Sequence, residues 1–505
     1  MSMAEAPRNH TPALDALEDR FRRLSSLHGA LGVLGWDRNV MMPPGGGAVR
    51  AEQSATLSVM AHEMLTASEV GDLLADAAHE AVSGDRAVNL VEMRRQHAHA
   101  TAVPSDLVEA LSRAASASEA KWRVARATSD FSLVRVELTE VVRLTREEAA
   151  AKSEALGTSP YEALLDQYEP GGSLPTINAL FSVLEAELPP ILEAVLDRQS
   201  RLPAPQAPEG PFPIEAQRVL SRQVMEILGF DFDHGRLDET LHPFCGGVPD
   251  DVRVTTRFSE DGFVSGIMGV IHETGHALYE RGLPPEWRNQ PAGDARGMVL
   301  HESQSLLMEM QASRTPEFLS FLSGIARTAF GGNGAAWEPE SLQRLYAHVE
   351  RGFIRVEADE ITYPLHVILR FRLEQALLSG DLQVADLPGA WNELHTKLLG
   401  VTPPDDARGC LQDIHWYDGA IGYFPTYTMG AMAAAQLFQA ALRADPGILS
   451  AIGQGDFTGL LAWLRPNVHQ RASLASTDEI LIAATGAPLG TDAFLAHLKR
   501  RYLPA

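Results

Sequence analysis

The sequence feature that most restricts the fold of this chain is the segment 270–279, which contains His272, Glu273 and His276 in a His-Glu-x-x-His pattern. On a helix, residues four apart differ by about 40° of rotation and one turn of rise. Both imidazoles therefore lean to the same side, where one tetrahedral Zn²⁺ can accept a nitrogen from each. Glu273 lies beside them as a carboxylate that can take a proton from water on the metal. Because a polar helix face can match this pattern by chance, a metal site also requires an apolar helix, a third ligand and a cleft.

The residues around this motif predict a buried helix over residues 263–280. Its apolar positions are Ile267, Val270, Ile271, Ala277 and Leu278. Gly282, followed by Pro284 and Pro285, is a typical C-terminal stop. Residues 251–258, just before the helix, alternate and are rich in β-branched side chains, and they are the one segment that we predict as a strand. A buried pair of histidines needs partners, which favours a metal over a solvated helix face.

The pattern leaves the third ligand open. A metzincin would need Gly at position 279 and His at position 282, but Tyr279 and Gly282 stand there. A glutamate from a following helix is another common solution. We predict that helix over residues 298–314, where Glu302, Ser305 and Glu309 share one face, although an exposed polar stripe would look the same. Glu280 and Asp294 are alternative candidates for the third ligand, but Glu280 ends the first helix and Asp294 lies in a loop.

Most of the remaining chain is predicted to be helical. Apolar periodicity predicts helices over residues 13–34, ending near Gly35-Trp36-Asp37, and through residues 49–156 with starts near Pro104 and Asp130. Another helix covers residues 177–188 and is expected to end at Pro189-Pro190, where a further short helix begins and runs to Arg198. Residues 202–213 contain five prolines and are the most linker-like segment. We expect a single domain over residues 1–505, and the alternative is a sub-boundary near residues 200–213.

Composition and charge exclude several classes of protein. The net charge of −24, from 66 acidic and 42 basic residues, argues against nucleic acid or an anionic membrane as a partner. Two cysteines, Cys245 and Cys410, cannot form a disulfide framework and fit a reducing compartment. Residues 1–23 lack the apolar region of a secretory signal, and the apolar stretch 429–442 is too short to cross a bilayer. We therefore expect a cytoplasmic protein.

Several longer motifs accompany the first one. They are His272-Glu273-Thr274-Gly275-His276, His301-Glu302-Ser303-Gln304-Ser305, His242-Pro243-Phe244, Asp251-Val252-Arg253-Val254-Thr255, Ile354-Arg355-Val356-Glu357-Ala358-Asp359, and Gly409-Cys410-Leu411-Gln412-Asp413-Ile414-His415-Trp416. In these motifs the chain resembles the carboxypeptidase Taq family of metallocarboxypeptidases. The resemblance extends to Trp36-Asp37 with Met42-Pro43 and to residues 161–171 and 422–427, so it covers nearly the whole chain.

The resemblance implies a mostly α fold of the neurolysin and angiotensin-converting-enzyme type, a large helical body divided by a deep active-site cleft. With the strand at residues 251–258, we expect a small β-sheet next to the metal-site helix. Members of the family form homodimers and release single amino acids from the free C-termini of peptides with broad specificity, using zinc or cobalt. The family pattern makes His272, His276 and Glu302 the metal ligands and Glu273 the catalytic carboxylate. By ligand type, such a site also accepts manganese.

The remaining roles follow from the chemistry that peptide hydrolysis needs. The oxyanion needs a donor besides the metal, and His415, Tyr423 and Tyr427 are the candidates, with an ordinary aromatic core as the alternative for the tyrosines. Asp413 is a candidate to orient His415.

An exopeptidase must also bind a free α-carboxylate, which a guanidinium does best. We favour Arg355 over Arg253 for this role. The alternative for both arginines is a structural ion pair, for example with Asp359 or Asp251. His242, held in an extended backbone before Pro243, is a further candidate to bind substrate.

Two other classes of function remain open. A metallo-oligopeptidase that cuts internal bonds shares the metal chemistry but does not need a carboxylate clamp, so amidated peptides separate it from a carboxypeptidase. A non-catalytic helical interaction protein would keep the ligands as a structural site, although closed structural zinc sites usually have four protein ligands rich in cysteine.

Overall fold

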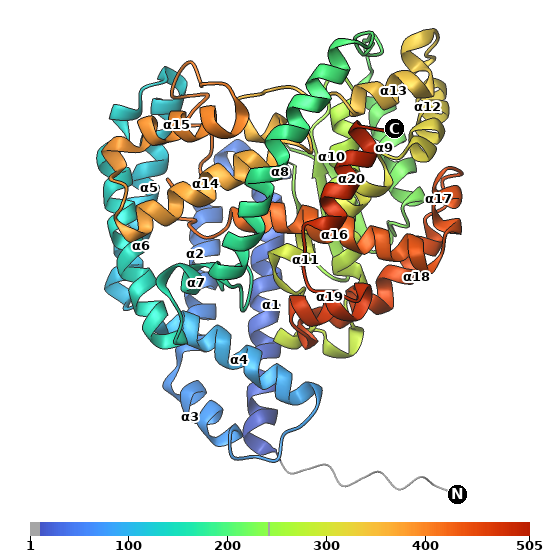
Figure 1. Ribbon diagram of the computed structural model, residues 1–505. Coiled ribbons are helices and arrows are strands. Elements are labelled where there is room, and N and C mark those ends of the chain that lie inside the picture. Colours follow the sequence, from blue (N-terminus) through green and yellow to red (C-terminus); the bar gives the residue numbers. More distant parts are fainter. Residues whose placement is uncertain (1–10, 241–242, 505) are drawn as a thin grey trace, which may run out of the picture.

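The computed structural model describes residues 11–240 and 243–504, and helices make up most of it (Figure 1). The helices before the sheet are α1 (Pro12–Val40), α2 (Gly47–Thr66), α3 (Ser68–Ala77), α4 (Asp85–Ala102), α5 (Ser105–Thr128), α6 (Arg135–Leu156), α7 (Pro160–Leu165), α8 (Leu174–Ser200) and α9 (Ile214–Ile227). Those after the sheet are α10 (Val264–Gly282), α11 (Gly297–Leu306), α12 (Pro316–Phe330), α13 (Pro339–Tyr346), α14 (Thr362–Ser379), α15 (Leu387–Leu399), α16 (Pro425–Ala444), α17 (Gly447–Ile452), α18 (Thr458–Asn467), α19 (Thr477–Thr485) and α20 (Asp492–Tyr502). A π-helical segment (Leu307–Ala312) continues α11.

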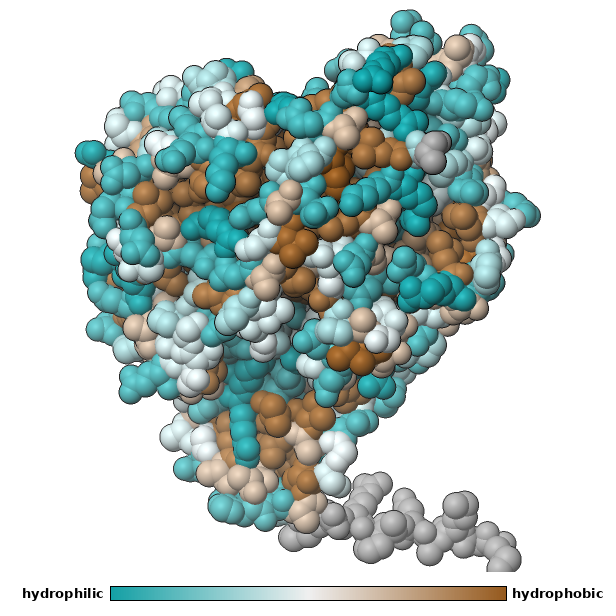
Figure 2. All heavy atoms as spheres, in the orientation of Figure 1, coloured by the Kyte–Doolittle hydropathy of each residue, from teal (hydrophilic) through white to brown (hydrophobic). Residues whose placement is uncertain are grey.

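The helices gather on two sides of the view, with α5, α6, α14 and α15 on the left and α9 to α13 with α16 to α20 on the right (Figure 1). One hydrophobic core extends from Trp122 to Tyr502 and includes residues on both sides of the proline-rich segment, such as Val195 and Leu220. A second, smaller cluster packs α1, α2, α3 and α4 together. On the face shown in Figure 2, hydrophilic side chains surround smaller apolar areas, and the outline is notched at the top between the two sides.

Three short strands form one sheet beside α10. They are β1 (Gly235–Glu239), β2 (Cys245–Val248) and β3 (Asp251–Thr256), in the order β1-β3-β2, with β1 parallel and β2 antiparallel to β3. The expected small β-sheet next to the metal-site helix is therefore present. The prediction of a single strand was wrong, because β1 and the glycine-containing β2 lack the alternating β-branched pattern and depend on pairing with β3.

The alternation of side chains along β3 decides where Arg253 points. Val252 and Val254 are buried and pack with Val270 and Ala277 of α10. Neighbouring side chains of a strand point to opposite faces, so Arg253 faces away from α10. Its guanidinium carbon lies 4.4 Å from the centroid of the Trp36 ring in α1.

Two predicted helix ends were wrong. Helix α1 continues past Gly35-Trp36-Asp37 to Val40, because Trp36 is buried and Asp37 forms an ion pair with Arg50 of α2. Helix α8 runs through Pro189 and Pro190. Prolines inside a helix remove hydrogen bonds and normally end it, but here the buried residues on both sides of them form one continuous apolar stripe. Those residues are Leu184, Leu188, Ile191, Leu192 and Val195.

Within residues 11–240 and 243–504, none of the helices has both the length and the apolar character that a membrane span requires.

Candidate active site

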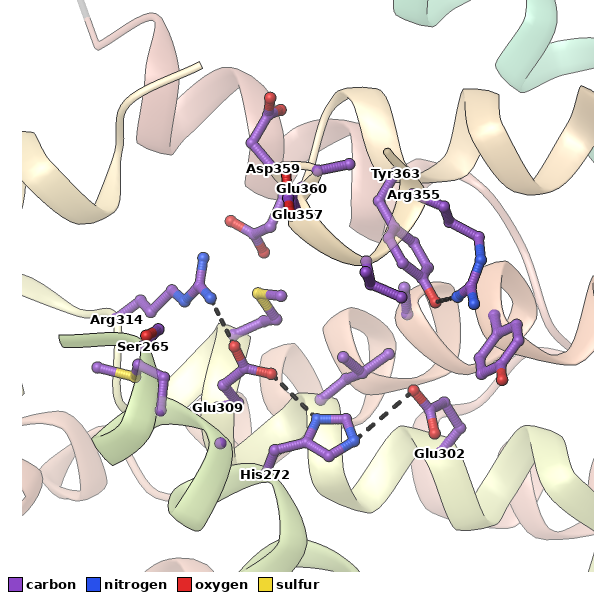
Figure 3. A pocket seen from close by; sticks show the side chains of 18 of the residues that line it. Ser265, His272, Glu302, Glu309, Arg314, Arg355, Glu357, Asp359, Glu360 and Tyr363 are labelled. Atoms are coloured by element: carbon purple, nitrogen blue, oxygen red, sulfur yellow. Dashed lines mark hydrogen bonds and ion pairs between the residues drawn. The ribbon is translucent and has the colours of Figure 1, made fainter. Parts of the chain in front are cut away.

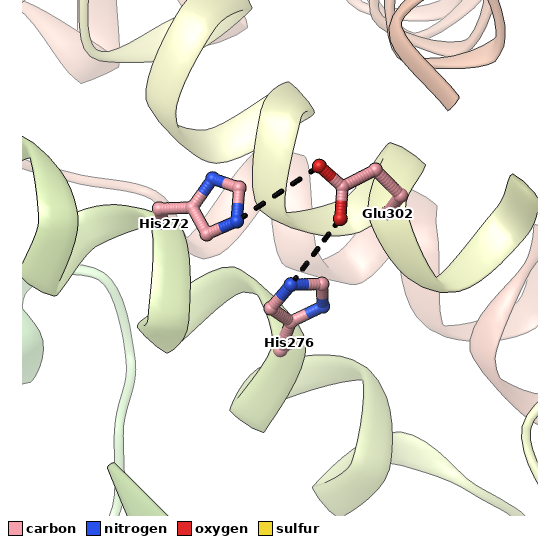
Figure 4. A group of neighbouring side chains, drawn as sticks. All are labelled: His272, His276 and Glu302. Atoms are coloured by element: carbon pink, nitrogen blue, oxygen red, sulfur yellow. Dashed lines mark ion pairs between the residues drawn. The ribbon is translucent and has the colours of Figure 1, made fainter. Parts of the chain in front are cut away.

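The two histidines of the motif and one glutamate from the next helix meet at a single point (Figure 4). His272 and His276 project from α10, and Glu302 projects from α11. One ligand atom from each of the three lies within 4.8 Å of the other two. The structure thus brings together the residues that the family resemblance named, and Glu280 and Asp294 are not part of this group.

The arrangement of these atoms fits a divalent metal. The Nε2 atom of His272 lies 4.0 Å from Glu302 Oε1, and the Nε2 atom of His276 lies 3.6 Å from Glu302 Oε2. Both separations exceed a hydrogen bond, whereas two ligands at 2.0–2.1 Å from a tetrahedral zinc ion lie about 3.3–3.4 Å apart. Small movements of the side chains would bring all three donors to one ion, as the donor set of two imidazoles and a carboxylate requires.

The second nitrogen of each imidazole has its own acceptor. His276 Nδ1 donates to the backbone oxygen of His301 at 3.1 Å, and His272 Nδ1 donates to Glu309 Oε2 at 3.0 Å. Each hydrogen bond orients its ring so that Nε2 faces Glu302, and in the neutral ring it fixes the tautomer that leaves the lone pair on Nε2.

Burial and charge adjust the protonation of this group. Burial, together with the nearby His301 and His272, holds the pKa of His276 well below its usual value, so this ring is neutral. Burial opposes protonation of His272, but the Glu309 hydrogen bond and the charges of Glu302 and Glu273 prevail and raise its pKa to about 10. The surrounding carboxylates therefore create a place where positive charge is stabilised, which suits a cation.

The three donors lie on the wall of a cavity of about 1050 Å³. Glu273, Arg355, Tyr423 and Tyr427 line the same cavity. Burial raises the pKa of Glu273, which prepares this carboxylate to accept a proton. Arg253 and His415 are not among the lining residues, and His242 lies outside the residues that the structure describes.

Arg355 is held at the cavity by two partners. Its Nε and Nη2 donate to Asp413 Oδ1 at 3.1 and 2.8 Å, and its Nη1 donates to the hydroxyl of Tyr363 at 2.9 Å. The other oxygen of Asp413 accepts from Arg370 Nε at 2.6 Å. The buried ion pair that the sequence allowed as an alternative for Arg355 is therefore present, but with Asp413. The suggested partner Asp359 was wrong, because it instead accepts from the backbone and hydroxyl of Thr362 at the start of α14.

Arg253 has the ion pair that the sequence allowed as an alternative. Its Nη2 lies 2.6 Å from Asp251 Oδ2, and its guanidinium stacks on Trp36. Of the two arginines, only Arg355 faces the cavity.

Tyr423, Tyr427 and His415 form an aromatic group next to the metal ligands. The Tyr427 hydroxyl lies 3.4 Å from His415 Nε2, and the rings of Tyr423 and Tyr427 are 5.1 Å apart. Burial lowers the pKa of His415 to about 4, so its ring is neutral at pH 7. Asp413 accepts hydrogen bonds from Arg355 and Arg370 rather than from His415. Tyr423 and Tyr427 line the cavity, and His415 contacts Tyr427 without lining it.

Sequence reasoning did not assign Arg314 and Tyr363, which also line the cavity, and it named Glu309 only as a neighbour of Glu302 on one helix face (Figure 3). A spacing of seven residues from Glu302 places Glu309 on the same side of the helix, two turns further on. The sequence therefore contained a signal that could have singled out Glu309. Arg314 and Tyr363 belong to contacts between distant segments, which local periodicity does not reveal.

Glycines allow the helices that carry the ligands to touch. A Cβ atom at Gly275 of α10 would lie 2.5 Å from the backbone oxygen of Gln304 and 2.6 Å from the Cα of Ser305 in α11. Similarly, a Cβ atom at Gly430 of α16 would lie 2.8 Å from the Cβ of Glu302. The backbone around Glu302 is thus held closely from two sides.

Replacing Gly275 with Ala is therefore expected to force α10 and α11 apart, to destabilise the protein by about 1–3 kcal/mol, and to weaken metal binding. Gly269→Ala on the same helix is the matched control, since a Cβ atom there would meet no atom within 4 Å. Because alanine favours a helix over glycine, the control should keep or raise the midpoint of thermal unfolding. Equal midpoints for the two variants would contradict this account of the helix contact.

Comparisons with known proteins identify the family of this chain. Residues 16–502 match the family model described as carboxypeptidase Taq (M32) metallopeptidase. Thermostable carboxypeptidase 1 of Thermus thermophilus is 38% identical over 501 residues, covering 95% of this chain and 97% of the relative. Carboxypeptidase 1 of Bacillus subtilis is 33% identical over 488 residues, covering 96% and 97%.

Solved structures show the same relationship. Metallocarboxypeptidase 1 of Trypanosoma cruzi superposes with a TM-score of 0.96 at 37% identity, covering 98% of this chain and 100% of that chain. The M32 carboxypeptidase of Deinococcus radiodurans superposes with a TM-score of 0.92 at 33% identity, covering 97% and 99%. With its fold and nearly its whole length shared, the chain belongs to the carboxypeptidase Taq (M32) family of metallopeptidases.

Proposed function

We propose that this protein hydrolyses the last peptide bond of peptides with a free C-terminus and releases single amino acids with broad specificity. The observation that carries the proposal is the convergence of His272, His276 and Glu302 beside Glu273 in a cavity that also contains Arg355. The first four residues supply the metal ligands and the proton acceptor that hydrolysis needs. The arginine supplies the positive charge that binds a free C-terminal carboxylate.

His272, His276 and Glu302 would hold the metal, for which we propose Zn²⁺, with Co²⁺ or Mn²⁺ as substitutes. When bound, such an ion supplies a Lewis acid that lowers the pKa of water and polarises the scissile carbonyl. Glu273 takes the proton that the attacking water loses and passes it to the leaving amine. A raised pKa brings this carboxyl group closer to the pH of the reaction. It can then both accept the proton from water and donate it to the amine.

Tyr423 and Tyr427 are proposed to donate hydrogen bonds to the oxyanion that develops on the scissile carbonyl. Burial raises the pKa of both hydroxyls, so they stay protonated and able to donate. His415, whose neutral ring lies near the Tyr427 hydroxyl, is proposed to assist in the same step.

Arg355 is proposed to bind the α-carboxylate of the substrate. Asp413 and Tyr363 hold its guanidinium in place, which reduces the entropy lost when a carboxylate binds. Arg253 is the weaker candidate because it points toward Trp36, away from the cavity. His242 retains its proposed role in substrate binding on the family motif alone.

We also propose, from the family resemblance, that the chain is one peptidase domain with two helical halves around a deep cleft, comparable to neurolysin and angiotensin-converting enzyme. The shared hydrophobic core on both sides of residues 202–213 supports a single domain. A homodimer and a cytoplasmic location complete the proposal, supported by the family resemblance and by the two free cysteines, respectively. Light scattering of the purified protein measures the oligomeric state.

One digest tests the reaction type. A mixture of peptides is incubated with the purified protein and followed by mass spectrometry, with metal analysis of the same preparation. A ladder of single C-terminal losses is expected. Rapid internal cleavage of peptides with amidated C-termini would instead identify a metallo-oligopeptidase, and no cleavage by a metal-loaded preparation would favour a structural metal site.

Removing the metal with a chelator is expected to abolish activity and to lower the unfolding midpoint, because a ligand at 100 times its Kd stabilises the folded state by about 2.7 kcal/mol. Adding back Zn²⁺, Co²⁺ or Mn²⁺ separately, and recording activity and unfolding midpoint for each, ranks the metals. Activity that survives complete metal removal would contradict the proposal.

A further inference from the structure

A pair of charged residues outside the donor set is connected to one of the metal ligands. Glu309 accepts from His272 Nδ1 with Oε2 at 3.0 Å, and its Oε1 lies 2.5 Å from Arg314 Nη2 (Figure 3). The side chains of Glu309 and Arg314 are only 11% and 16% exposed. The charged groups therefore form one chain, from Arg314 through Glu309 to the imidazole of His272.

Glu309 lies in a stretch of unusual backbone. Helix α11 ends at Leu306 and continues as a π-helical segment, Leu307–Ala312, which contains Glu309. π-Helical turns are rare in proteins, and those that do occur are often found at functional sites. Glu302 of α11 and Glu309 of the π-helical segment approach opposite nitrogens of the same ring, Nε2 and Nδ1.

The two histidines are oriented in different ways. A backbone oxygen, that of His301, accepts from His276 Nδ1, and no side-chain substitution can remove it. The acceptor for His272 is a carboxylate, which is itself free to rotate unless something holds it. Arg314 is the group that holds it, since a charge-assisted hydrogen bond fixes the second oxygen.

We propose that Glu309 is a positioning residue for the metal site and that Arg314 acts through it. Glu309 fixes His272 in the tautomer and rotamer that direct the Nε2 lone pair toward Glu302, and it raises the basicity of that nitrogen. Arg314 keeps the Glu309 carboxylate in the orientation in which it accepts from Nδ1. This inference rests on the proposed metal site, and it adds two residues that act on metal affinity without touching the ion.

The test measures the zinc dissociation constant of the metal-free protein by competition with a chromophoric chelator. Glu309→Ala is expected to weaken zinc binding about 10- to 100-fold, the usual effect of losing such a partner. Glu309→Gln keeps an oxygen acceptor and should lose less. Glu185→Gln is the matched control: Glu185 of α8 pairs with Arg372 of α14 at 2.7 Å, away from the metal ligands, and its loss should leave the constant unchanged.

A double-mutant cycle tests the role of Arg314. Arg314→Met should weaken zinc binding by less than Glu309→Ala, and the double variant should bind as Glu309→Ala does, because Arg314 acts only through Glu309. Additive losses would overturn this assignment of Arg314. Unfolding midpoints of the metal-free variants show whether a weaker constant reflects the fold rather than the site.

The outcomes also separate this inference from the proposed function. If the wild type fails to bind zinc or to cleave peptides, the proposed function fails. If the wild type binds zinc and cleaves, while Glu309→Ala binds zinc as tightly as the wild type, only the positioning role is overturned.

Discussion

Glu273→Gln is expected to lower kcat by about 10²- to 10⁴-fold, the contribution of a positioned general base and acid, while the zinc content of the protein stays the same. The amide keeps the shape of the side chain but cannot accept the proton of the attacking water. Glu273 is not one of the three donors that converge in the structure, so its replacement should leave the ligands in place. Initial rates of amino-acid release and metal analysis of the same sample give both quantities.

Two further variants serve as controls for Glu273→Gln. His276→Ala should lose activity together with zinc, which shows what loss of the metal looks like. Glu185→Gln, remote from the site, should retain the activity of the wild type. An unchanged kcat of the Glu273→Gln protein would contradict the role of Glu273 in proton transfer, even if the three residues do bind the metal.

The second large effect is expected for Arg355. Arg355→Lys keeps a positive charge near Asp413 but loses the planar fork that can bind a carboxylate through two hydrogen bonds. Charge-assisted hydrogen bonds contribute about 1.5–3 kcal/mol each, so kcat/KM for peptides with a free C-terminus should fall by about two orders of magnitude. Any residual cleavage of amidated peptides should not change, since those substrates lack the carboxylate.

Arg253→Lys is the matched control for Arg355→Lys. Arg253 also lies in an ion pair with an aspartate and near an aromatic ring, but it points away from the cavity. We expect a small change in stability and no change in substrate preference. If Arg253→Lys reduced kcat/KM for free-acid peptides and Arg355→Lys did not, the two proposed roles would have to be exchanged.

The grouping of His272, His276 and Glu302 could be anticipated from the sequence, in part because the spacing of the two histidines is a local property of a helix. His272 and His276 lie four apart on one helix, and Glu302 lies on the next helix along the chain, so short-range geometry and the family motifs name all three. Alternation along the predicted strand also indicates, from sequence alone, that the side chains of Arg253 and Val254 point to opposite faces of the sheet. Only the packing of Val254 on α10 shows which of these faces is buried against the site helix.

Other features could not be predicted because they arise from contacts between distant parts of the chain. Asp413 is a candidate from the sequence to orient His415, but its carboxylate accepts hydrogen bonds from Arg355 and Arg370, which lie elsewhere in the sequence. The strands β1 and β2 exist through their pairing with β3, and α8 continues through two prolines because its apolar stripe packs on the core. In each case tertiary packing prevails over local preference.

The close contact at Gly275 has a consequence for how the protein takes up its metal. Because α10 and α11 touch backbone to backbone, the ligands are carried by one packed unit whose geometry does not depend on the ion. Many small zinc domains, by contrast, fold only when the metal binds. Calorimetry of metal binding to this protein should therefore lack the large negative heat-capacity change of coupled folding, and hydrogen exchange should show similar protection of both helices with and without metal.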